Sequence, residues 1–257
     1  MSNMNLSISS LKLFKACRRA YQFKNIYRII PVETSAALAT GTSYHEMIET
    51  LHRDGSIPEL NSKEAAMARA YATYIMPDMP EFEPEVWFEK KVGRCKTLIG
   101  RLDGKTENAI IEHKTTSVNS IDEYEFNLQM DEQLLAYFLA TGCRNAFYTV
   151  CRKPTIRQKQ SETDVEFAQR CYEWYSDDTY NKIRLLKVSR TDDEVEAFKQ
   201  ELIKMFKVIR TAAKNDEYYR NTCYCNAWGR PCEYSSICLN YDPTQEYVNF
   251  KKREDQY

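Results

Sequence analysis

The segment Leu98-Ile-Gly-Arg-Leu-Asp-Gly-Lys-Thr-Glu-Asn-Ala-Ile-Ile-Glu-His-Lys114 reads as two strands joined by a turn. Gly104 to Asn108 is rich in turn-forming residues and separates two runs of aliphatic and β-branched residues. This pattern predicts a hairpin between Thr97–Asp103 and Ala109–Thr115. The two strands would stand at the centre of the predicted sheet.

The charged residues of this hairpin are placed by strand alternation. Side chains of a strand point alternately to its two faces, so Glu112 and Lys114 share one face and His113 points to the other. The hairpin also brings Asp103 toward Glu112. The sequence therefore predicts two carboxylates and one ammonium close together at one place in the sheet.

Hydrophobic periodicity predicts the elements around this hairpin, and strands that alternate with helices indicate an α/β protein. We find no internal repeat, and 257 residues with 43% hydrophobic and 28% charged content fit a single domain spanning residues 1–257. Helices are predicted from Ser7 or Ser9 through Tyr21 and at Thr42–Glu49, Lys63–Ile75, Leu128–Thr141, Thr163–Tyr175 and Asp193–Lys214, and strands at Val86–Val92, Asn145–Cys151 and Ile183–Ser189.

Composition also excludes some protein classes. No window approaches the roughly 18 apolar residues of a membrane span, and Met1 to Leu11 lacks the charged start and apolar stretch of a signal peptide. A cytoplasmic protein without a membrane partner is therefore expected, and the sequence leaves an oligomer possible.

The formal net charge is -1, yet the charges are distributed unevenly along the sequence. The first acidic residue is Glu33, so the segment before it is strongly positive, and the loop Arg152–Gln160 is also basic. These residues either form solvated surface or hold the phosphate backbone of a nucleic acid. The candidates for DNA contact are Lys12, Lys15, Arg18, Arg19, Arg152, Lys153 and Arg157.

The nine cysteines favour a metal site over disulfides, because the number is odd and the expected compartment is reducing. Cys223, Cys225, Cys232 and Cys238 place four thiols within sixteen residues. Thiolates bind iron–sulfur clusters and structural zinc, but the spacing matches neither a zinc ribbon nor a ferredoxin. Cys17, on the inward side of the first predicted helix, is the natural distant ligand, unless it is only a small buried hydrophobe.

Such a site would join the segments 1–30 and 218–240. Joining Cys17 to the tail closes a loop of more than two hundred residues. By the chain-entropy model for cross-links, the constraint could stabilise the fold by roughly 5 kcal/mol. A structural zinc ion, with the carboxylates as mere surface charges, is the competing interpretation.

Three polar side chains outside the hairpin are further candidates. His45 follows Gly41 and shares a helix face with Glu49, so it is either a metal ligand or a structural histidine. Gln133 and Tyr137 lie one helical turn apart, and either touch DNA or satisfy buried polar groups.

Taken in order, these motifs resemble the RecB-like iron–sulfur branch of the PD-(D/E)xK nuclease superfamily. That branch includes the AddB nuclease domain, CRISPR-associated cluster exonucleases, exonuclease V and phage proteins. The resemblance spans nearly the whole chain, each motif is loose, and their order is specific. The matching segments are Ser7–Cys17, Gly41–His45, Gly100–Asp103, Glu112–Lys114, Gln133–Tyr137 and the terminal cysteines.

The resemblance implies a restriction-endonuclease-like mixed central sheet flanked by helices, with the N- and C-terminal segments joined at an iron–sulfur cluster. Two positions depart from the family pattern: Arg18 and Leu102 stand where proline is common. By the family pattern, His45, Asp103 and Glu112 bind metal, Lys114 assists catalysis, Gln133 and Tyr137 complete the site, and Cys17, Cys232, Cys238 and either Cys225 or Cys223 hold a [4Fe-4S] cluster, with Cys225 favoured.

The implied activity is metal-dependent hydrolysis of DNA. Carboxylate oxygens suit Mg²⁺ or Mn²⁺, and an imidazole ligand favours Mn²⁺. Contacts to the phosphate backbone carry no sequence information, so an exonuclease acting on single-stranded ends or flaps is expected. The alternative is a non-catalytic, cluster-bearing DNA-binding module of a repair, recombination or CRISPR-adaptation complex.

Overall fold

The structure is a computed structural model that describes residues 3–33, 35–227, 229–240 and 249–253. It divides into two compact units. One unit comprises 1–35, 90–99 and 199–257, and the other comprises 36–89 and 100–198. Strands β3 and β4 and helix α9 each run from one unit into the other. That residues 1–257 form one domain stays a prediction.

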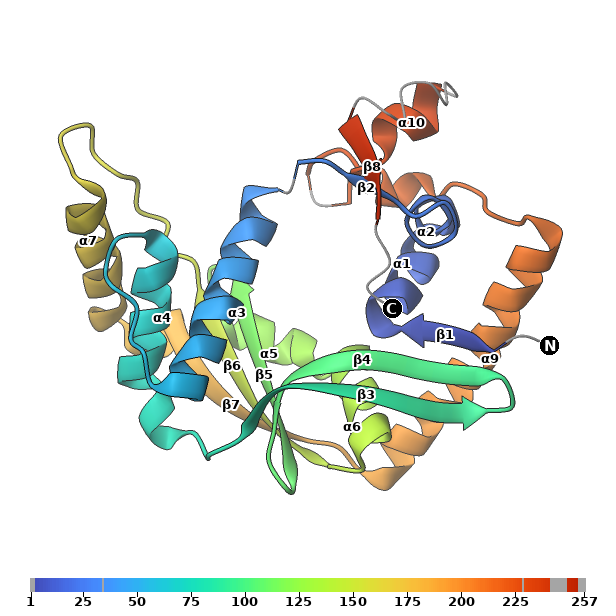
Figure 1. Cartoon of the computed structure of the whole chain (residues 1–257), viewed down its shortest axis with the longest axis horizontal. Coiled ribbons are helices and arrows are strands. Elements are labelled where there is room, and N and C mark those ends of the chain that lie inside the picture. Colours follow the sequence, from blue (N-terminus) through green and yellow to red (C-terminus); the bar gives the residue numbers. More distant parts are fainter. Residues whose placement is uncertain (1–2, 34, 228, 241–248, 254–257) are drawn as a thin grey trace. The chain divides into compact units, whose positions relative to one another are not determined.

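The second unit, 36–89 and 100–198, is built on a mixed sheet (Figure 1). β4 pairs antiparallel with β5, β5 runs parallel to β6 with Glu112 opposite Tyr148, and β6 pairs antiparallel with β7. The predicted hairpin is confirmed. The elements of this unit are α3 (Ala36–Asp54), α4 (Lys63–Tyr74), η2 (Met76–Asp78), β3 (Glu83–Gly93), β4 (Lys96–Lys105), β5 (Ala109–Thr116), α5 (Ile121–Leu128), α6 (Glu132–Thr141), β6 (Asn145–Arg152), α7 (Asp164–Ser176), α8 (Thr179–Lys182), β7 (Ile183–Ser189) and the start of α9 (Asp192–Asn215).

Helices cover both faces of this sheet, because each strand sends alternate side chains to opposite sides. On one face, Cys151 and Ile183 pack against α3, α4 and α7. On the other, Ile110, Tyr148 and Val150 pack against α5 and α6. The mixed central sheet flanked by helices, predicted from the sequence, is confirmed (Figure 1).

Two helix boundaries differ from the sequence prediction. The single helix Leu128–Thr141 is wrong at its start: α5 ends at Leu128, and α6 begins only after Asp131, whose side chain accepts a hydrogen bond from the Gln133 amide. α3 begins at Ala36, so Gly41 lies inside the helix and not in a loop before it. Packing against α4 and β5 outweighs the low helix propensity of glycine there.

The first unit, 1–35, 90–99 and 199–257, contains both predicted cluster-binding segments, of which residues 1–2 and 228 lie outside the described part. β1 runs parallel to the first residues of β4, and β2 pairs antiparallel with β8. Its elements are β1 (Met4–Ser7), α1 (Ile8–Ala16), α2 (Arg18–Tyr21), the π-helical turn η1 (Gln22–Ile26), β2 (Ile29–Pro31), most of α9, η3 (Thr222–Tyr224), α10 (Ser235–Asn240) and β8 (Phe250–Lys252).

The first predicted helix is interrupted at its cysteine. Ser7 caps α1, as predicted, by accepting a hydrogen bond from the Ser10 amide. At Cys17 the backbone is extended, with φ -158° and ψ 113°, and the chain restarts as α2. The prediction of one continuous helix through Tyr21 is therefore wrong, although Cys17 itself is buried.

The tail has a small apolar core of its own. Tyr234, Ile237 and Phe250 are buried together with Cys17 and Ile29. The Tyr234 hydroxyl donates a hydrogen bond to the Ile29 carbonyl at 3.0 Å. The absence of sequence periodicity in the tail thus concealed a real apolar cluster.

Among the described residues, no helix is long and apolar enough to cross a membrane.

Candidate active site and cysteine pocket

Asp103, Glu112 and Lys114 lie together where β4 and β5 separate. The His113 amide donates a hydrogen bond to Asp103 Oδ2 at 2.7 Å, which ties the carboxylate to β5. Lys114 Nζ forms an ion pair with Glu112 Oε1 on the same strand face. The Glu112 side chain is 1% exposed and that of Lys114 is 27% exposed. Within this ion pair, Lys114 is therefore the partner that is accessible to solvent.

Gln133 and Tyr137 on α6 belong to the same site. Gln133 Nε2 donates hydrogen bonds to Glu112 Oε1 and to the Tyr137 hydroxyl, both at 2.8 Å. The Tyr137 hydroxyl in turn donates a hydrogen bond to the Arg101 carbonyl at 3.1 Å. Arg101 lies two residues before Asp103 on β4. The sequence left open whether these side chains touch DNA or satisfy buried polar groups. In the structure they form hydrogen bonds with buried polar atoms of the site.

His45 on α3 approaches the site from the opposite side. Its Nδ1 lies 3.5 Å from Asp103 Oδ1, and its ring is partly exposed. Burial disfavours the imidazolium, but the hydrogen bond and charge of Asp103 outweigh this and raise the pKa of His45. Glu49 and Glu85 line the same pocket as His45 and Asp103. The sequence treated Glu49 only as a helix neighbour and missed Glu85, because the pairing of β3 with β4 is not readable from spacing.

The pKa values of the two carboxylates are shifted in opposite directions, although burial raises both. Burial raises the pKa of Asp103, but His45 and Lys114 outweigh it, so the pKa of Asp103 lies well below its usual range. Burial and the nearby Asp103 charge raise the pKa of Glu112 above its usual range, against the attraction of Lys114. The same carboxylates raise the pKa of Lys114 despite its burial. The site thus holds a concentrated negative charge that a cation would relieve.

The donor set fits a divalent cation. Glu112 Oε2 is buried without a hydrogen-bond partner among the described residues, although a carboxylate oxygen normally requires one. Asp103 and Glu112 offer oxygen ligands, and His45 offers a ring nitrogen. Within the described part of the chain, however, no three His, Cys, Asp or Glu side chains already form a metal-binding group. Lys114 and Gln133 engage Glu112 Oε1 instead.

The other two histidines have structural partners. His113 is buried, and its Nδ1 lies 2.7 Å from the Thr149 hydroxyl. Burial lowers the pKa of His113 to about 3, so the ring is neutral. His52 Nε2 lies 2.7 Å from the Tyr71 hydroxyl.

Gln133 provides the first test of the site. Gln133→Ala would remove one of the two described donors to Glu112 Oε1 while retaining the carboxylates and Lys114. We expect cleavage of DNA to fall by about 10- to 100-fold, the usual effect of losing a group that orients a ligand. Initial rates of oligonucleotide cleavage would measure it. Gln169→Ala, on the exposed surface of α7, is the matched control, and equal rates for both variants and wild type would contradict the role.

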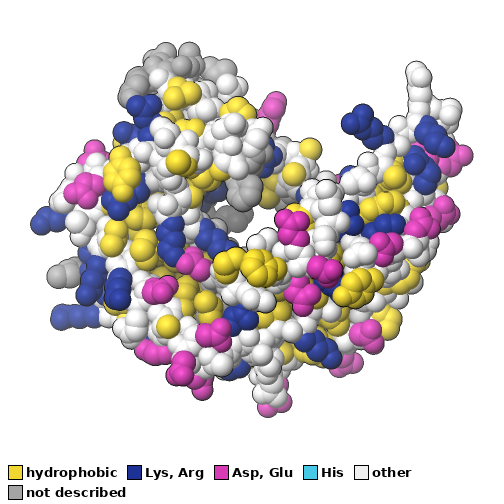
Figure 2. All heavy atoms as spheres, turned by 180° about the vertical axis from the view of Figure 1, so that it is seen from behind, with side chains coloured by type: hydrophobic (Ala, Val, Ile, Leu, Met, Phe, Trp, Pro, Cys, Tyr) yellow, Lys and Arg dark blue, Asp and Glu magenta, His cyan; other side chains and the backbone are white. Residues whose placement is uncertain are grey.

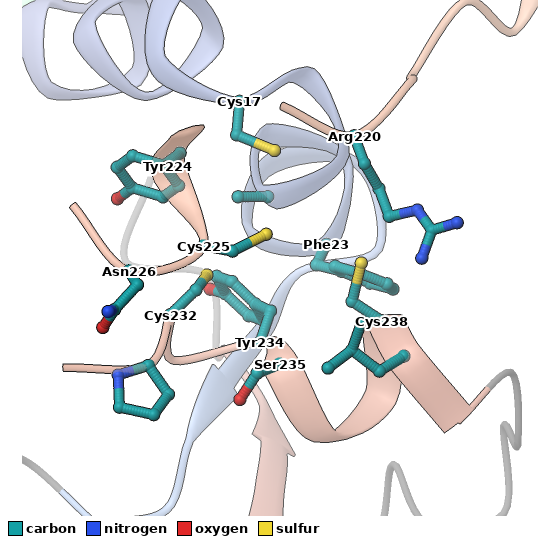
Figure 3. A pocket seen from close by; sticks show the side chains of 13 residues that line it. Cys17, Phe23, Arg220, Tyr224, Cys225, Asn226, Cys232, Tyr234, Ser235 and Cys238 are labelled. Carbon is teal, nitrogen blue, oxygen red and sulfur yellow. The ribbon is translucent and has the colours of Figure 1, made fainter. Parts of the chain in front are cut away.

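Four cysteines of the first unit surround one cavity of about 150 Å³. We call it the cysteine pocket, and its thiols come from Cys17, Cys225, Cys232 and Cys238. Figure 3 shows their sulfur atoms turned toward the shared space. Cys223 is exposed and is not among the residues that line the pocket.

The pocket is held by main-chain contacts. The Asn221 amide donates to Cys17 Sγ at 3.5 Å, and the Cys232 amide donates to the Cys225 carbonyl at 2.8 Å. Burial raises the pKa of the Cys232 and Cys238 thiols. The chemistry of four soft sulfur donors around an otherwise largely apolar cavity fits an iron–sulfur cluster, although no ready-made metal group is found among the described residues.

The remaining cysteines are isolated from this pocket. Cys143, Cys151 and Cys171 are buried, as the sequence predicted for core residues, and Cys95 is half-buried. Cys151 Sγ lies 3.3 Å from the Tyr175 hydroxyl within the helical layer over the sheet.

The basic residues predicted to touch DNA are distributed over both units. Several are engaged within the fold: the Arg18 guanidinium lies over the Phe14 and Tyr219 rings, and Lys153 Nζ donates to the Ala37 carbonyl. Figure 2 shows Lys and Arg side chains at the projecting segment that precedes α7. Lys12, Lys15 and Arg157 are exposed, Arg19 donates to Gln22 at 2.8 Å, and Arg152 donates to the Asn181 carbonyl at 2.9 Å.

Comparisons with known proteins agree with this geometry. The model of the PD-(D/E)XK nuclease superfamily matches residues 5–94. A candidate exonuclease from Eubacterium rectale has a TM-score of 0.53 at 13% identity, covering 92% of this chain and 93% of its own. The crystal structure of the protein SSO0001 has a TM-score of 0.50 at 12% identity, covering 93% of this chain and 88% of its own. No curated protein matches the chain in sequence.

The resemblance to the PD-(D/E)XK nuclease superfamily is thereby confirmed. At their low identities, the two solved structures show a shared fold over nearly the whole chain. The family match ends before Asp103, so the convergence of Asp103, Glu112 and Lys114 is an independent observation. The RecB-like branch is a finer assignment that these comparisons leave as a proposal.

Proposed function

We propose that this protein is a metal-dependent DNA exonuclease of the RecB-like branch, which hydrolyses phosphodiester bonds at single-stranded ends or flaps. One observation carries the proposal: Asp103, Glu112 and Lys114 converge at the splayed end of a β4–β5 hairpin, with Gln133 bonded to Glu112. The match to a nuclease superfamily supports it.

The chain's own residues would perform distinct tasks at the scissile phosphate. Lys114 carries a positive charge at a partly exposed position, so it can donate a hydrogen bond to the attacking water and stabilise negative charge on the phosphate. Gln133 and Tyr137 fix the Glu112 carboxylate, and the His113 amide fixes Asp103. A side chain held in this way pays little conformational entropy to reach its reactive orientation when the substrate binds.

His45, Asp103 and Glu112 would hold Mg²⁺ or Mn²⁺, and the imidazole favours Mn²⁺. When bound, the ion supplies charge neutralisation and a more acidic water. Two carboxylates would balance the charge of one such ion. Glu112 Oε2, which has no hydrogen-bond partner in the described part of the chain, and the low pKa of Asp103 support this assignment, because both carboxylates gain from a nearby cation.

Cys17, Cys225, Cys232 and Cys238 would hold a [4Fe-4S] cluster that joins the segments 1–30 and 218–240. All four line one cavity, which supports Cys225 over Cys223 as the ligand. When bound, the cluster supplies a covalent cross-link between the two ends of the chain. Its proposed role is structural, because it would join two segments that are distant in the sequence.

DNA would be gripped through its backbone by exposed basic residues of α1 and of the segment before α7. Lys12, Lys15 and Arg157 are exposed and are the main candidates, and Arg18, Arg19, Arg152 and Lys153, which make contacts within the fold, are further candidates. Such contacts weaken as salt increases and carry no sequence information. We therefore propose digestion with little sequence preference.

The decisive experiment is digestion of single-stranded oligonucleotides labelled at either terminus, with Mg²⁺ or Mn²⁺ added to the purified protein. Asp103→Ala should reduce the rate by about a thousandfold, since it removes a metal ligand worth several kcal/mol of transition-state stabilisation. Asp122→Ala, which alters an exposed carboxylate paired with Arg184, is the control and should retain wild-type rates. A wild-type protein that shifts the DNA without shortening it would instead be a binding module.

A further inference from the structure

Trp87 on β3 displays a large aromatic surface beside the candidate site. Val86 and Phe88 pack against the core cluster of the sheet, so strand alternation sends Trp87 to the opposite face. Trp87 is 55% exposed. A single exposed aromatic residue is common on protein surfaces and indicates nothing alone. The case for a function of Trp87 comes from its neighbours Arg101 and Glu85.

Arg101 holds the indole in place. It lies on β4 two residues before Asp103, and therefore on the same face, about 7 Å along the strand. Its guanidinium carbon lies 5.4 Å from the centre of the Trp87 ring. Its Nη1 forms an ion pair with Glu85 Oε2 at 2.5 Å, and Glu85 itself lines the pocket of Asp103. Contacts thus run from the exposed indole through Arg101 to Glu85, in the pocket that Asp103 also lines.

The backbone at Glu85 is also unusual. Its φ is 58°, in the left-handed region that residues other than glycine adopt rarely and at a cost of about 1–3 kcal/mol. Strain of this kind persists where surrounding contacts fix it, and it is frequent at binding sites. Here it lies at the point where β3 presents Glu85 to Arg101.

We propose that Trp87 stacks on an unpaired base of the single strand whose phosphodiester lies at Asp103 and Glu112, with Arg101 orienting the indole. The inference rests on the proposed nuclease function and deepens it. An aromatic face with a guanidinium beside it is the surface that single-stranded nucleic acids use, and stacking tolerates every base. It would hold the strand in register for cutting without reading its sequence.

The charges around Trp87 favour a nucleotide over a protein partner. The centre of a protein interface is usually depleted of charged residues. Trp87 instead has two charged neighbours, Glu85 and Arg101. The Arg101 side chain is 52% exposed. A base with an attached phosphate offers both an apolar face for the indole and an anion for the guanidinium.

The test compares Trp87→Ala and Trp87→Phe with wild type. Affinity for a labelled single-stranded oligonucleotide is measured by fluorescence anisotropy without divalent metal, and cleavage is measured separately with Mn²⁺. Each is repeated with an oligonucleotide that carries abasic positions in place of the terminal bases. Tyr180→Ala is the matched control, because Tyr180 is 62% exposed and has the Arg184 guanidinium 4.3 Å from its ring centre, but lies on α8.

We expect Trp87→Ala to weaken binding of the normal oligonucleotide about tenfold, as for loss of one stacked base. Trp87→Phe and Tyr180→Ala should stay close to wild type, and all four proteins should bind the abasic oligonucleotide equally. Normal binding by Trp87→Ala, or an equal loss on the abasic strand, would overturn the stacking role while leaving the nuclease intact. A wild-type protein that neither binds nor shortens the strand would overturn the proposed function, and this inference with it.

Discussion

Lys114→Ala should abolish DNA cleavage while leaving DNA binding nearly unchanged. Lys114 forms an ion pair with Glu112, and the two carboxylates raise its pKa, so it is charged at neutral pH. Removing it takes away the group placed to act on the attacking water. The expected loss in rate is about a hundredfold to ten-thousandfold, the range found for a positioned proton donor or acceptor.

Single-turnover cleavage and binding by anisotropy would separate the two effects. Lys105→Ala, on the neighbouring strand β4, removes a lysine outside the ion pair and serves as the control. Lys114→Arg adds a useful contrast, because it keeps the charge but replaces a compact ammonium with a planar fork. Undiminished cleavage by Lys114→Ala would refute the role. A parallel loss of binding would show that the lysine acts on substrate affinity and not on the reaction.

Cys17→Ala should destabilise the protein strongly and remove the absorption of an iron–sulfur cluster. Protein purified without oxygen should be brown, and the variant should be colourless. Loss of a constraint worth roughly 5 kcal/mol would lower Tm by about 10–20 °C for a protein of this size. Absorption spectra and thermal denaturation measure the two effects, and neither depends on nuclease activity.

The other cysteines provide the controls for this experiment. Cys223→Ala should retain both colour and Tm, because Cys223 is exposed outside the cysteine pocket. Cys225→Ala should behave like Cys17→Ala. If Cys223→Ala lost the colour and Cys225→Ala kept it, Cys223 and not Cys225 would be the cluster ligand. A colourless wild-type protein that contains zinc by elemental analysis would replace the cluster with a structural zinc ion.

The sequence by itself determined the chemistry of the hairpin. Strand alternation placed Glu112 and Lys114 on one face, and the turn formers of Gly104–Asn108 placed Asp103 beside them; the structure has both features. Local periodicity was sufficient because these residues are close in sequence. Element type was also predictable for long periodic segments such as β7 and α9, whose ends differ by at most one residue from the prediction.

Helix interruptions were less accessible to sequence reasoning. The split between α5 and α6 depends on the Asp131 cap, and the break at Cys17 accompanies packing against the tail; a window of hydrophobic residues reports neither. The apolar cluster of Tyr234 and Phe250 was hidden for a similar reason, because its members come from short segments without a period.

Only the tertiary structure decided which distant residues meet. It placed Gln133 on Glu112, put Glu85 in the same pocket as Asp103, and gathered Cys17 with Cys225 around one cavity. Spacing along a chain fixes the direction of a side chain within one helix or strand. Which strands pair and which helix covers them depends on burial of apolar surface over the whole unit, and this is a property of the folded chain.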